Sequence, residues 1–281
     1  VVIPDSVNNI GKQAFRLCTS LNSITIPDGV TLGLDVFLDT GYYNNRSNWI
    51  NGVLYIGNHI IETDGTSSGS LVIKEGTLSI PDSAFVGCGN ITSVTIPESV
   101  TSIGNRAFEG CANLQSVTIP EGVMSVGEYA FSGCEGLQTV KIPTTLESIG
   151  ASAFENCFCL SYVYINDIAS WCNISFGNLD SNPLGYASYL YVGSVLITDL
   201  VVPQTVAVIP AWAFSCLNIE TVTLSNNVKS IGECAFADCI NLTSVDLTKV
   251  YGLTKVSAYA FSDCEKLSDI IFNGEIEELT L

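Results

Sequence analysis

Hydrophobic and polar residues alternate along the chain in a unit that returns every 23 residues. Residues 96–118 read IPESVTSIGNRAFEGCANLQSVT, residues 119–141 read IPEGVMSVGEYAFSGCEGLQTVK, and a third copy begins at residue 142. In LQSVTIP, Leu114, Val117 and Ile119 should point inward, and Ser116 and Thr118 outward, as in a half-buried β-strand. A fixed period in the twenties indicates a solenoid, whose turns bury their apolar faces against one another.

The rest of each turn is also predictable. Proline ends the strand because it has no N–H to donate. Ile103 starts a second short buried segment, and the AFEGC stretch, too short for a stable helix, should return the chain in one helical or 3-10 turn. A glycine column between these segments predicts a positive φ or a tight contact. Its members are Gly11, Gly104, Gly127, Gly150 and Gly232.

Phenylalanine marks the register, because it follows alanine in eight turns. The column consists of Phe15, Phe85, Phe108, Phe131, Phe154, Phe214, Phe236 and Phe261. Most steps are 22 to 25 residues, but steps of 70 and 60 residues contain larger units at about residues 31–70 and 166–198. Each larger unit has two apolar runs around a Gly-Asn or Gly-Ser pair, in GVLYIGNHIIE and SYLYVGSVLIT, which predicts a β-hairpin.

The pattern LxxVxIP..VxxIGxxAFxxC resembles the BspA-like leucine-rich repeats, also called the Treponema pallidum type, over nearly the whole chain. The second larger unit resembles this family in INDIASWCNISFGN and LYVGSVLITDLVVP. Members are mostly bacterial surface or secreted proteins, and several are linked to adhesion to host proteins or other cells. The resemblance implies a strand-rich leucine-rich-repeat solenoid of the α/β horseshoe type with one parallel strand per turn, a cell-surface or extracellular location, and no catalytic residues.

No linker interrupts the repeat, so residues 1–281 are predicted to form a single solenoid domain. Its eleven strand positions would stack to roughly 50 Å at about 4.8 Å per strand. Hydrophobic residues make up 47% of the chain, which can fill a continuous core. The chain opens inside a repeat without a signal peptide or a polar cap, as expected of a mature or trimmed fragment, so the missing signal leaves its location open.

The net charge is −18, with only 10 Lys and Arg. This argues against nucleic acid and anionic membrane as ligands, because both require basic patches. Solubility explains the acidity most simply, and structural calcium is the alternative. The sequence has no D-x-D-x-D-G loop, however, and the acids after proline occur once per turn, at Asp5, Asp28, Glu98 and Glu121.

Eight of the 11 cysteines follow the repeat, two or three residues after the phenylalanine. They are Cys18, Cys88, Cys111, Cys134, Cys157, Cys216, Cys239 and Cys264. Stacked turns should place them in a buried ladder of free thiols, since cysteine packs as a small hydrophobic residue. Disulfides are the alternative, because surface proteins are often oxidised and neighbouring rungs are close enough. A bond between Cys159 and Cys172, which lie outside the ladder, stays open.

Catalytic chemistry has little support in this sequence. His59 is the only histidine, so no histidine-rich metal site or array of Cys–His dyads can form. The chain has neither a C-x-x-C motif nor a G-x-S-x-G elbow. Paired carboxylates stay open, because a sequence does not give their separation. We expect a non-enzymatic protein without metal or cofactor.

Candidate partner-binding residues lie mainly on the outward face of the strands. Most outward positions are Ser or Thr, which is typical of a solvated sheet. Tyr162 and Tyr164 break this pattern together on one rung, and exposed aromatic residues are enriched in recognition sites. The candidate set is Tyr162, Tyr164, Lys141, Asp246 and Trp171.

The larger unit offers a competing explanation for some aromatic residues. Trp171, Phe176 and Tyr191 can instead fill the core of that unit, and this interpretation is favoured for these three residues. For Tyr162 and Tyr164, the alternation of the strand favours exposure.

The family resemblance implies non-catalytic adhesion of a bacterial surface or secreted protein to a host matrix protein or to another cell's surface protein, and the tyrosine pair indicates where on the chain the partner would bind. Binding of carbohydrate or cell-wall glycan is the alternative, because the same aromatic residues can stack on sugar rings. A purely structural surface-layer or stalk repeat is a further alternative. Ice binding by the Ser/Thr rows is disfavoured, since Tyr, Lys, Asp and Val interrupt them.

Overall fold

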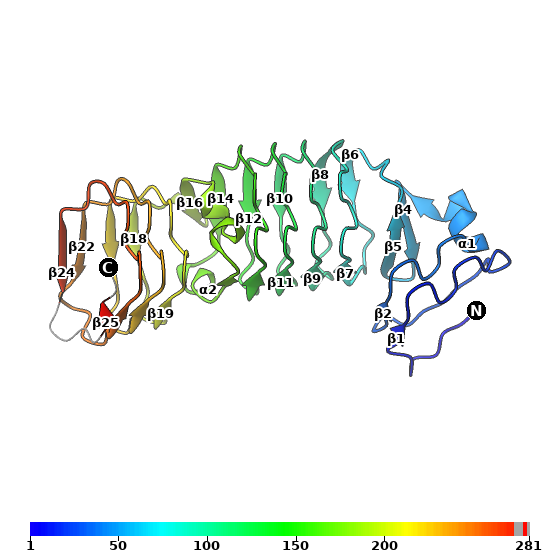
Figure 1. Ribbon diagram of the computed structural model, residues 1–281, viewed down its shortest axis with the longest axis horizontal. Helices are drawn as coiled ribbons and strands as arrows, with labels where there is room; N and C mark the ends of the chain where they lie inside the picture. The colour runs from blue at the N-terminus through cyan, green and yellow to red at the C-terminus, as the bar shows by residue number, and fades with distance from the viewer. Residues whose placement is uncertain (273–277, 280–281) are drawn as a thin grey trace.

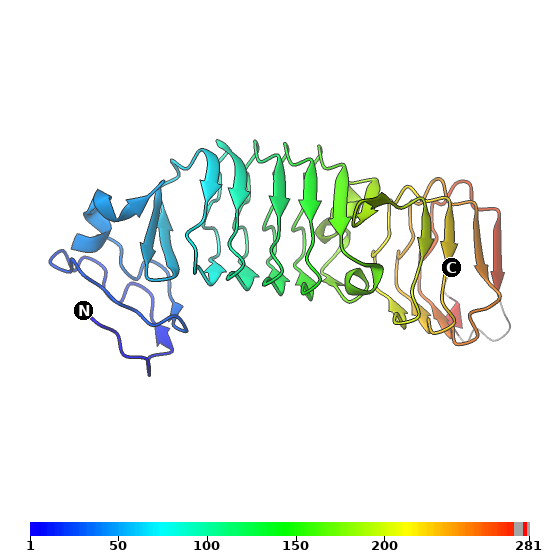
Figure 2. The same ribbon diagram turned by 180° about the vertical axis from the view of Figure 1, so that it is seen from behind.

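The computed structural model describes residues 1–272 and 278–279, and it is a strand-rich solenoid of about 11 turns (Figures 1 and 2). The turns stack along one long axis, with the two termini toward opposite ends. A regular turn supplies one strand to a first sheet, a two-residue strand to a second sheet, and a return segment of successive tight turns. The parallel solenoid predicted from the 23-residue period is confirmed.

The first sheet has seven strands in the order β17-β16-β14-β12-β10-β8-β6. The strands are β6 (Gly69–Val72), β8 (Ile91–Thr95), β10 (Ser116–Thr118), β12 (Thr139–Lys141), β14 (Tyr162–Ile165), β16 (Tyr189–Val192) and β17 (Val195–Leu196). All neighbours are parallel except β16 and β17, which form one of the two predicted hairpins. The second sheet follows the same turns with β7 (Ser79–Ile80), β9 (Ser102–Ile103), β11 (Ser125–Val126), β13 (Ser148–Ile149) and β15 (Ser175–Phe176).

The C-terminal turns continue the pattern in two further parallel sheets. One contains β18 (Asp199–Val201), β20 (Thr221–Thr223), β22 (Ser244–Leu247) and β24 (Asp269–Phe272). The other contains β19 (Val208–Ile209), β21 (Ser230–Ile231), β23 (Lys255–Val256) and β25 (Glu278–Leu279). At the N-terminal end, β1 (Asn9–Ile10) pairs with β2 (Thr31–Leu32), and Val2 forms an isolated bridge with Thr25.

Helical segments occur in the larger units and are short. They are α1 (Gly41–Asn44), η1 (Arg46–Asn48), α2 (Ile168–Trp171), η2 (Leu179–Ser181) and η3 (Pro183–Gly185). In regular turns the AF–C stretch makes hydrogen bonds of the expected i to i+3 type, such as Glu109 N–H to Arg106 O at 3.2 Å, but as separate tight turns. Among the described residues, no helix has the length and apolar character needed to cross a membrane.

A ladder of stacked phenylalanine rings runs through the core. The rings of Phe108, Phe131 and Phe154 are fully buried, and neighbouring centroids lie 5.4 Å apart with nearly parallel planes. The spacing follows from the fold, because parallel strands about 4.8 Å apart bring the same column into contact in each turn. Phe37, which follows valine rather than alanine, also belongs to the ladder and stacks on Phe15 at 5.5 Å.

The glycine column marks close contacts between successive turns. A Cβ on Gly127 would lie 2.5 Å from Asn105 N, and one on Gly150 would lie 2.5 Å from Glu128 N. Neither glycine has a positive φ, so of the two predicted reasons the tight contact is correct at these positions. Gly11 has no atom within 4 Å of such a Cβ, in keeping with its place in the first turn.

The cysteine ladder is buried through the middle of the solenoid. All 11 cysteines are free, so the structure has no bond between Cys159, which is exposed, and Cys172, which is buried. Ladder thiols donate to a phenylalanine carbonyl of the preceding turn, as Cys134 Sγ does to Phe108 O at 3.2 Å. The prediction of burial is wrong for Cys18, which lies at the N-terminal end and is exposed. Cys216, in the C-terminal turns, is only half-buried.

The other predicted hairpin consists of β4 (Val53–Ile56) and β5 (His59–Thr63), which form a three-stranded sheet with β3 (Trp49–Ile50). The regular repeat extends through residue 40, so this larger unit begins later than the predicted residue 31. The hairpin lies between two clusters of buried residues: Ile56 packs with the N-terminal turns, and Val53 and Tyr55 pack with the main core. The expected continuous core is therefore divided at this hairpin.

Candidate binding surface

Four tyrosines, called here the tyrosine cluster, lie together on the outward face of β14 and β16. The parallel register places Tyr162 beside Tyr189 and Tyr164 beside Tyr191. The ring centroids of these pairs are 5.8 Å and 4.7 Å apart, with interplanar angles of 24° and 19°. Tyr162 also meets Tyr191 edge to face at 6.3 Å, so all four rings form one connected group.

Buried aliphatic residues that alternate with the tyrosines anchor the two strands in the core. Val163 and Leu190, which lie between the tyrosines in sequence, are fully buried in the core. Tyr162 and Tyr189 are each 39% exposed, and Tyr164 is half-buried. The rings therefore stand on a rigid base, and little side-chain entropy remains to be lost when a partner binds.

Lys141 extends the cluster on one side. It occupies the rung before Tyr164 on β12, and its Nζ lies 5.9 Å from the centroid of the Tyr164 ring. A cavity of about 210 Å³ opens beside this pair, with Glu121 and Asn166 on its wall. Asn166 Nδ2 donates to Glu121 Oε1 at 2.8 Å, which fixes a polar group next to the aromatic surface.

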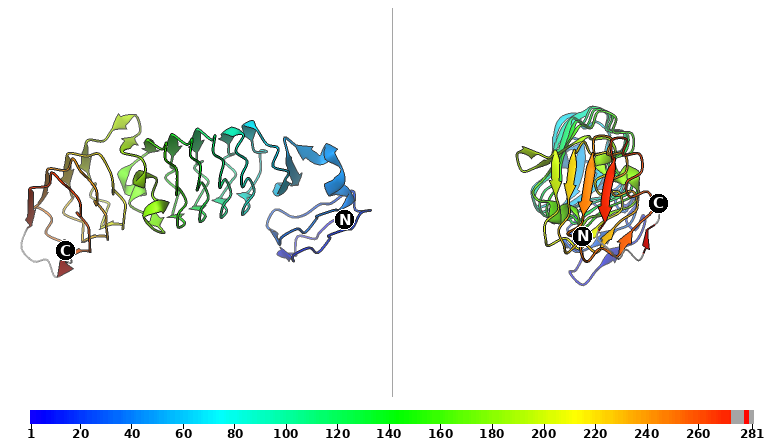
Figure 3. Two further views of the ribbon diagram at one scale, coloured as in Figure 1. Left: turned by 45° about the horizontal axis from the view of Figure 1, so that its top comes forward. Right: turned by 90° about the vertical axis from the view of Figure 1, so that its left-hand side faces the viewer.

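An apolar edge borders the cluster on the other side. Strand β17 is the edge of the first sheet, and its Leu196 pairs with Tyr191. Val195 is 63% exposed and Leu196 is 37% exposed. The hairpin of β16 and β17 projects from the body of the solenoid (Figure 3). Tyrosines, exposed aliphatic side chains and one cation thus form a continuous surface.

The structure brings only some of the candidate residues together. Tyr162, Tyr164 and Lys141 are adjacent, as the sequence predicts. Asp246 is exposed but lies on β22 of a different sheet, where its carboxylate accepts hydrogen bonds from Thr248. The side-chain hydrogen bond from Thr248, together with the backbone one, lowers the pKa of Asp246.

Trp171 has to be removed from the binding set. Its side chain is 1% exposed, and its Nε1 donates to Ala213 O at 2.8 Å inside the core. The competing explanation, a core role, is correct for Trp171 and also for Phe176, which is buried against it. It is wrong for Tyr191, which lies outside the main core and stacks on Tyr164.

Sequence reasoning missed the rung formed by Tyr189 and Tyr191. The repeat period alone assigns no outward position to Tyr189 or Tyr191, whereas the register places them on the rung directly after Tyr162 and Tyr164. The available signal was the similarity of YVYI at residues 162–165 to YLYV at residues 189–192. Both segments alternate tyrosine with an aliphatic residue, as adjacent rungs of one sheet should.

The described part of the chain has no group of three or more His, Cys, Asp or Glu side chains placed to hold a metal ion. Burial raises the pKa of the Cys111 and Cys157 thiols to about 12, so these ladder cysteines are poor nucleophiles at neutral pH.

Comparison with known proteins gives the family. The BspA type leucine-rich repeat region matches in six copies, over residues 1–37, 55–182 and 186–280. The chain therefore belongs to the BspA-type leucine-rich repeat family, whose solenoids are typically non-enzymatic. No curated protein matches the sequence.

One of three similar solved structures has a TM-score above 0.5 and supports the fold. A leucine-rich repeat protein from Bacteroides ovatus is 24% identical with a TM-score of 0.51, and the match covers 99% of this chain and 73% of that one. The Treponema pallidum leucine-rich repeat protein is also 24% identical, with a TM-score of 0.41, over 71% of this chain and 78% of that one. A leucine rich cell surface protein from Faecalibacterium prausnitzii is 25% identical, with a TM-score of 0.38, over 96% of this chain and 72% of that one.

Proposed function

We propose that this protein is a non-catalytic adhesin of a bacterial cell surface, and that it binds a protein of a host matrix or of another cell through the tyrosine cluster. Its membership of a repeat family of binding and surface proteins supports the general class. Lys141 and the exposed edge of β17 complete the proposed contact surface. No cofactor or catalytic step is part of the proposal.

One observation supports a protein as the partner: the four tyrosines stack on one another in two pairs. Tyr164 and Tyr191, at 4.7 Å, use ring faces for mutual contact, as do Tyr162 and Tyr189. Stacking of this kind leaves ring edges and hydroxyl groups to face a partner. Edges and hydroxyls suit a protein surface, where tyrosine combines apolar contact with hydrogen bonds and is enriched in hot spots.

Glycan binding is the second candidate, and the cavity beside Lys141 favours it. Asn166 and Glu121 on its wall can hydrogen-bond to hydroxyl groups. A sugar ring, however, stacks on an open aromatic face, and neighbouring rings already occupy faces within the cluster. A protein partner therefore agrees better with the geometry.

Long-range electrostatics add a condition on the partner. The chain carries a net charge of −18, so a basic protein would be steered toward it and an acidic one repelled. The association rate with the partner should accordingly fall as salt screens the charges, because the screening length shortens to about 8 Å at physiological ionic strength.

A binding screen of the purified protein against matrix proteins, mucins and glycans, by surface plasmon resonance, tests the proposal. For a hit, the double variant Tyr162→Ser, Tyr164→Thr restores the common Ser/Thr rung. It should weaken binding at least about tenfold, since a hot-spot aromatic residue contributes about 2 kcal/mol. The exposed Tyr251, replaced by Ser, is the matched control. Unchanged affinity in the double variant would contradict the proposed site, and hits confined to glycans would favour the second candidate.

A further inference from the structure

A three-bond hydrogen-bond ladder joins the return segments of successive regular turns. In one turn the N–H groups of Arg106, Phe108 and Gly110 donate to carbonyls of the next turn. The acceptors are Glu128 O at 2.8 Å, Ala130 O at 2.7 Å and Ser132 O at 2.8 Å. Equivalent N–H groups recur along the solenoid. Each return segment therefore has three N–H donors that bond to the next turn where that turn is present.

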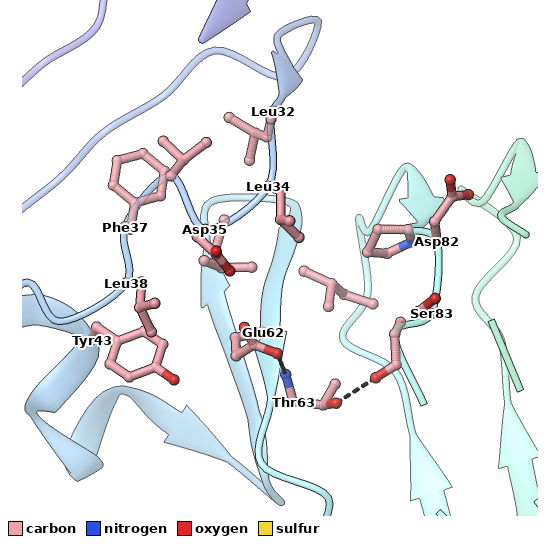
Figure 4. A pocket seen from close by; sticks show the side chains of 16 residues that line it. Leu32, Leu34, Asp35, Phe37, Leu38, Tyr43, Glu62, Thr63, Asp82 and Ser83 are labelled. Atoms are coloured by element: carbon pink, nitrogen blue, oxygen red, sulfur yellow. Dashed lines mark hydrogen bonds between the residues drawn. The ribbon is translucent and has the colours of Figure 1, made fainter. Parts of the chain in front are cut away.

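The first larger unit interrupts the ladder. The equivalent donors are the N–H groups of Asp35, Phe37 and Asp39, and none has a hydrogen-bond partner among the residues that the structure describes. The equivalent acceptors across the interruption belong to the turn of residues 81–88. Of these, Ala84 O accepts from Thr63 Oγ1 on β5 (Figure 4).

The second larger unit shows how the same chain fills such an interruption. The corresponding N–H groups of Ser152, Phe154 and Asn156 all find acceptors within the segment of η2 and η3. These acceptors are Asn178 Oδ1 at 2.9 Å, Asp180 O at 3.0 Å and Tyr186 Oη at 3.0 Å. In the second larger unit, the irregular segment of residues 178–186 therefore supplies the acceptors that a regular next turn supplies elsewhere.

The first unit has a cavity at the equivalent place. Its volume is about 420 Å³, within the usual range of about 300–1,000 Å³ for ligand sites. The donor turn, with Asp35 and Leu34, lines one side, the turn of Ser83 lines the other, and Glu62 of β5 lies between them (Figure 4). Tyr43 forms a further part of the wall.

We propose that this cavity binds an extended peptide segment of a partner protein, with one Lys or Arg side chain placed between Asp35 and Glu62. The peptide carbonyls accept from the free N–H groups of the donor turn, and its N–H groups donate to Asp82 O and Val86 O, the two ladder acceptors that accept no hydrogen bond among the described residues. This is strand addition to a broken ladder, a common mode of peptide recognition. The site is separate from the tyrosine cluster and does not depend on it.

The carboxylates of Asp35 and Glu62 favour a basic side chain in the bound peptide. Glu62 is half-buried, and desolvation raises its pKa, with the nearby Asp35 carboxylate adding to the effect. No ion pair to Asp35 or Glu62 occurs within residues 1–272, where Arg46–Asp64 and Arg106–Glu109 are the pairs found. Both carboxylates accept hydrogen bonds from neutral donors, Asp35 from Gln13 Nε2 at 3.2 Å and Glu62 from Thr63 N–H at 3.0 Å. A ligand cation would add the opposite charge, and the Tyr43 ring offers an aromatic wall beside it.

Isothermal titration of the intact protein with the capped peptide Thr-Val-Thr-Lys-Thr-Val-Thr tests the proposal. We expect a Kd below about 1 mM and at least tenfold weaker binding when norleucine or Glu replaces the central Lys. Methylation of alternate backbone nitrogens should also weaken binding tenfold or more, which a simple ion site would not do. Amide exchange at Asp35, Phe37 and Asp39 should slow at least tenfold on saturation.

Matched variants place the site. Glu62→Gln should weaken binding of the Lys peptide at least tenfold, whereas Glu135→Gln, at an exposed carboxylate elsewhere, should leave it unchanged. The double tyrosine variant should also leave it unchanged, which separates this test from that of the adhesin. Equal binding of the Lys and Glu peptides, or unaltered amide exchange in the wild-type complex, overturns the proposal. Sedimentation showing a dimer that Glu62→Gln dissociates would identify a second copy as the occupant and overturn it too.

Discussion

Replacing Phe131 by alanine tests the one-dimensional stack most severely. The ring is fully buried, lies between Phe108 and Phe154 at 5.4 Å on each side, and has no chain end nearby. Phe131 N–H bonds to Ala153 O at 2.8 Å, so the backbone cannot easily collapse into the space left by the ring. We therefore expect a loss of about 3–5 kcal/mol in the free energy of unfolding.

Phe15→Ala is the matched comparison. Phe15 is half-buried and stacks on a single ring, that of Phe37, in the first turn. Full burial of a phenylalanine is worth about 1.5–3 kcal/mol, so half burial with one stacking partner predicts a loss of about 1–2 kcal/mol. Terminal turns of a repeat array can also unfold separately, which confines the damage.

Equilibrium unfolding in urea, followed by circular dichroism, gives both free energies, and amide exchange shows which turns open. Phe131→Ala should shift the main transition, whereas Phe15→Ala should mainly speed exchange in the N-terminal turns. Equal losses at the two sites, with the same turns opening, would refute the idea that each turn depends only on its neighbours.

The remaining predictions concern the turn contacts, the thiols and one carboxylate. Gly127→Ala should cost at least about 2 kcal/mol, because its Cβ would lie 2.5 Å from Asn105 N, whereas Gly11→Ala, with open space, should be nearly neutral; equal Tm values would contradict the contact. Titration with a disulfide reagent should label Cys18 and Cys159 in the native protein, and the buried thiols only after unfolding without reductant; a need for reductant would contradict the free ladder. Glu62→Gln should stabilise the protein at pH 7, because a carboxyl group with a raised folded-state pKa makes the folded protein less stable as pH rises through that pKa. The gain in stability should vanish below about pH 4, where Glu62 is protonated in both the folded and the unfolded state. A gain that does not depend on pH would contradict the raised pKa of Glu62.

The repeat could be predicted from sequence because its physics is local and recurs in every turn. The strand alternation, the buried phenylalanine column and the two hairpins need only the period and turn chemistry. Phe37 was missed because the column was defined by a preceding alanine, although Phe37 lies 22 residues after Phe15. A small side chain before the ring is a preference of the turn, and Val36 also fits there, buried.

The site was less predictable because it depends on how a larger unit joins the regular turns. Spacing alone assigned Tyr189 to no rung, and only the register shows that β16 follows β14 directly. Trp171 illustrates the opposite error, because an aromatic residue in an irregular segment has no periodicity to indicate its direction. Its burial depends on the carbonyl of Ala213, 42 residues away, to which its indole nitrogen donates.

Hydroxyl-radical footprinting of the complex with a protein partner is the decisive test of the tyrosine cluster as the binding surface. Tyr162, Tyr164, Tyr189 and Tyr191 should be protected from oxidation by the bound partner. Tyr251 and Tyr259, which are 78% and 61% exposed in the C-terminal turns, should be oxidised as fast as in the free protein. Protection of Tyr251 or Tyr259, with the four clustered tyrosines oxidised at their free rates, would contradict the account.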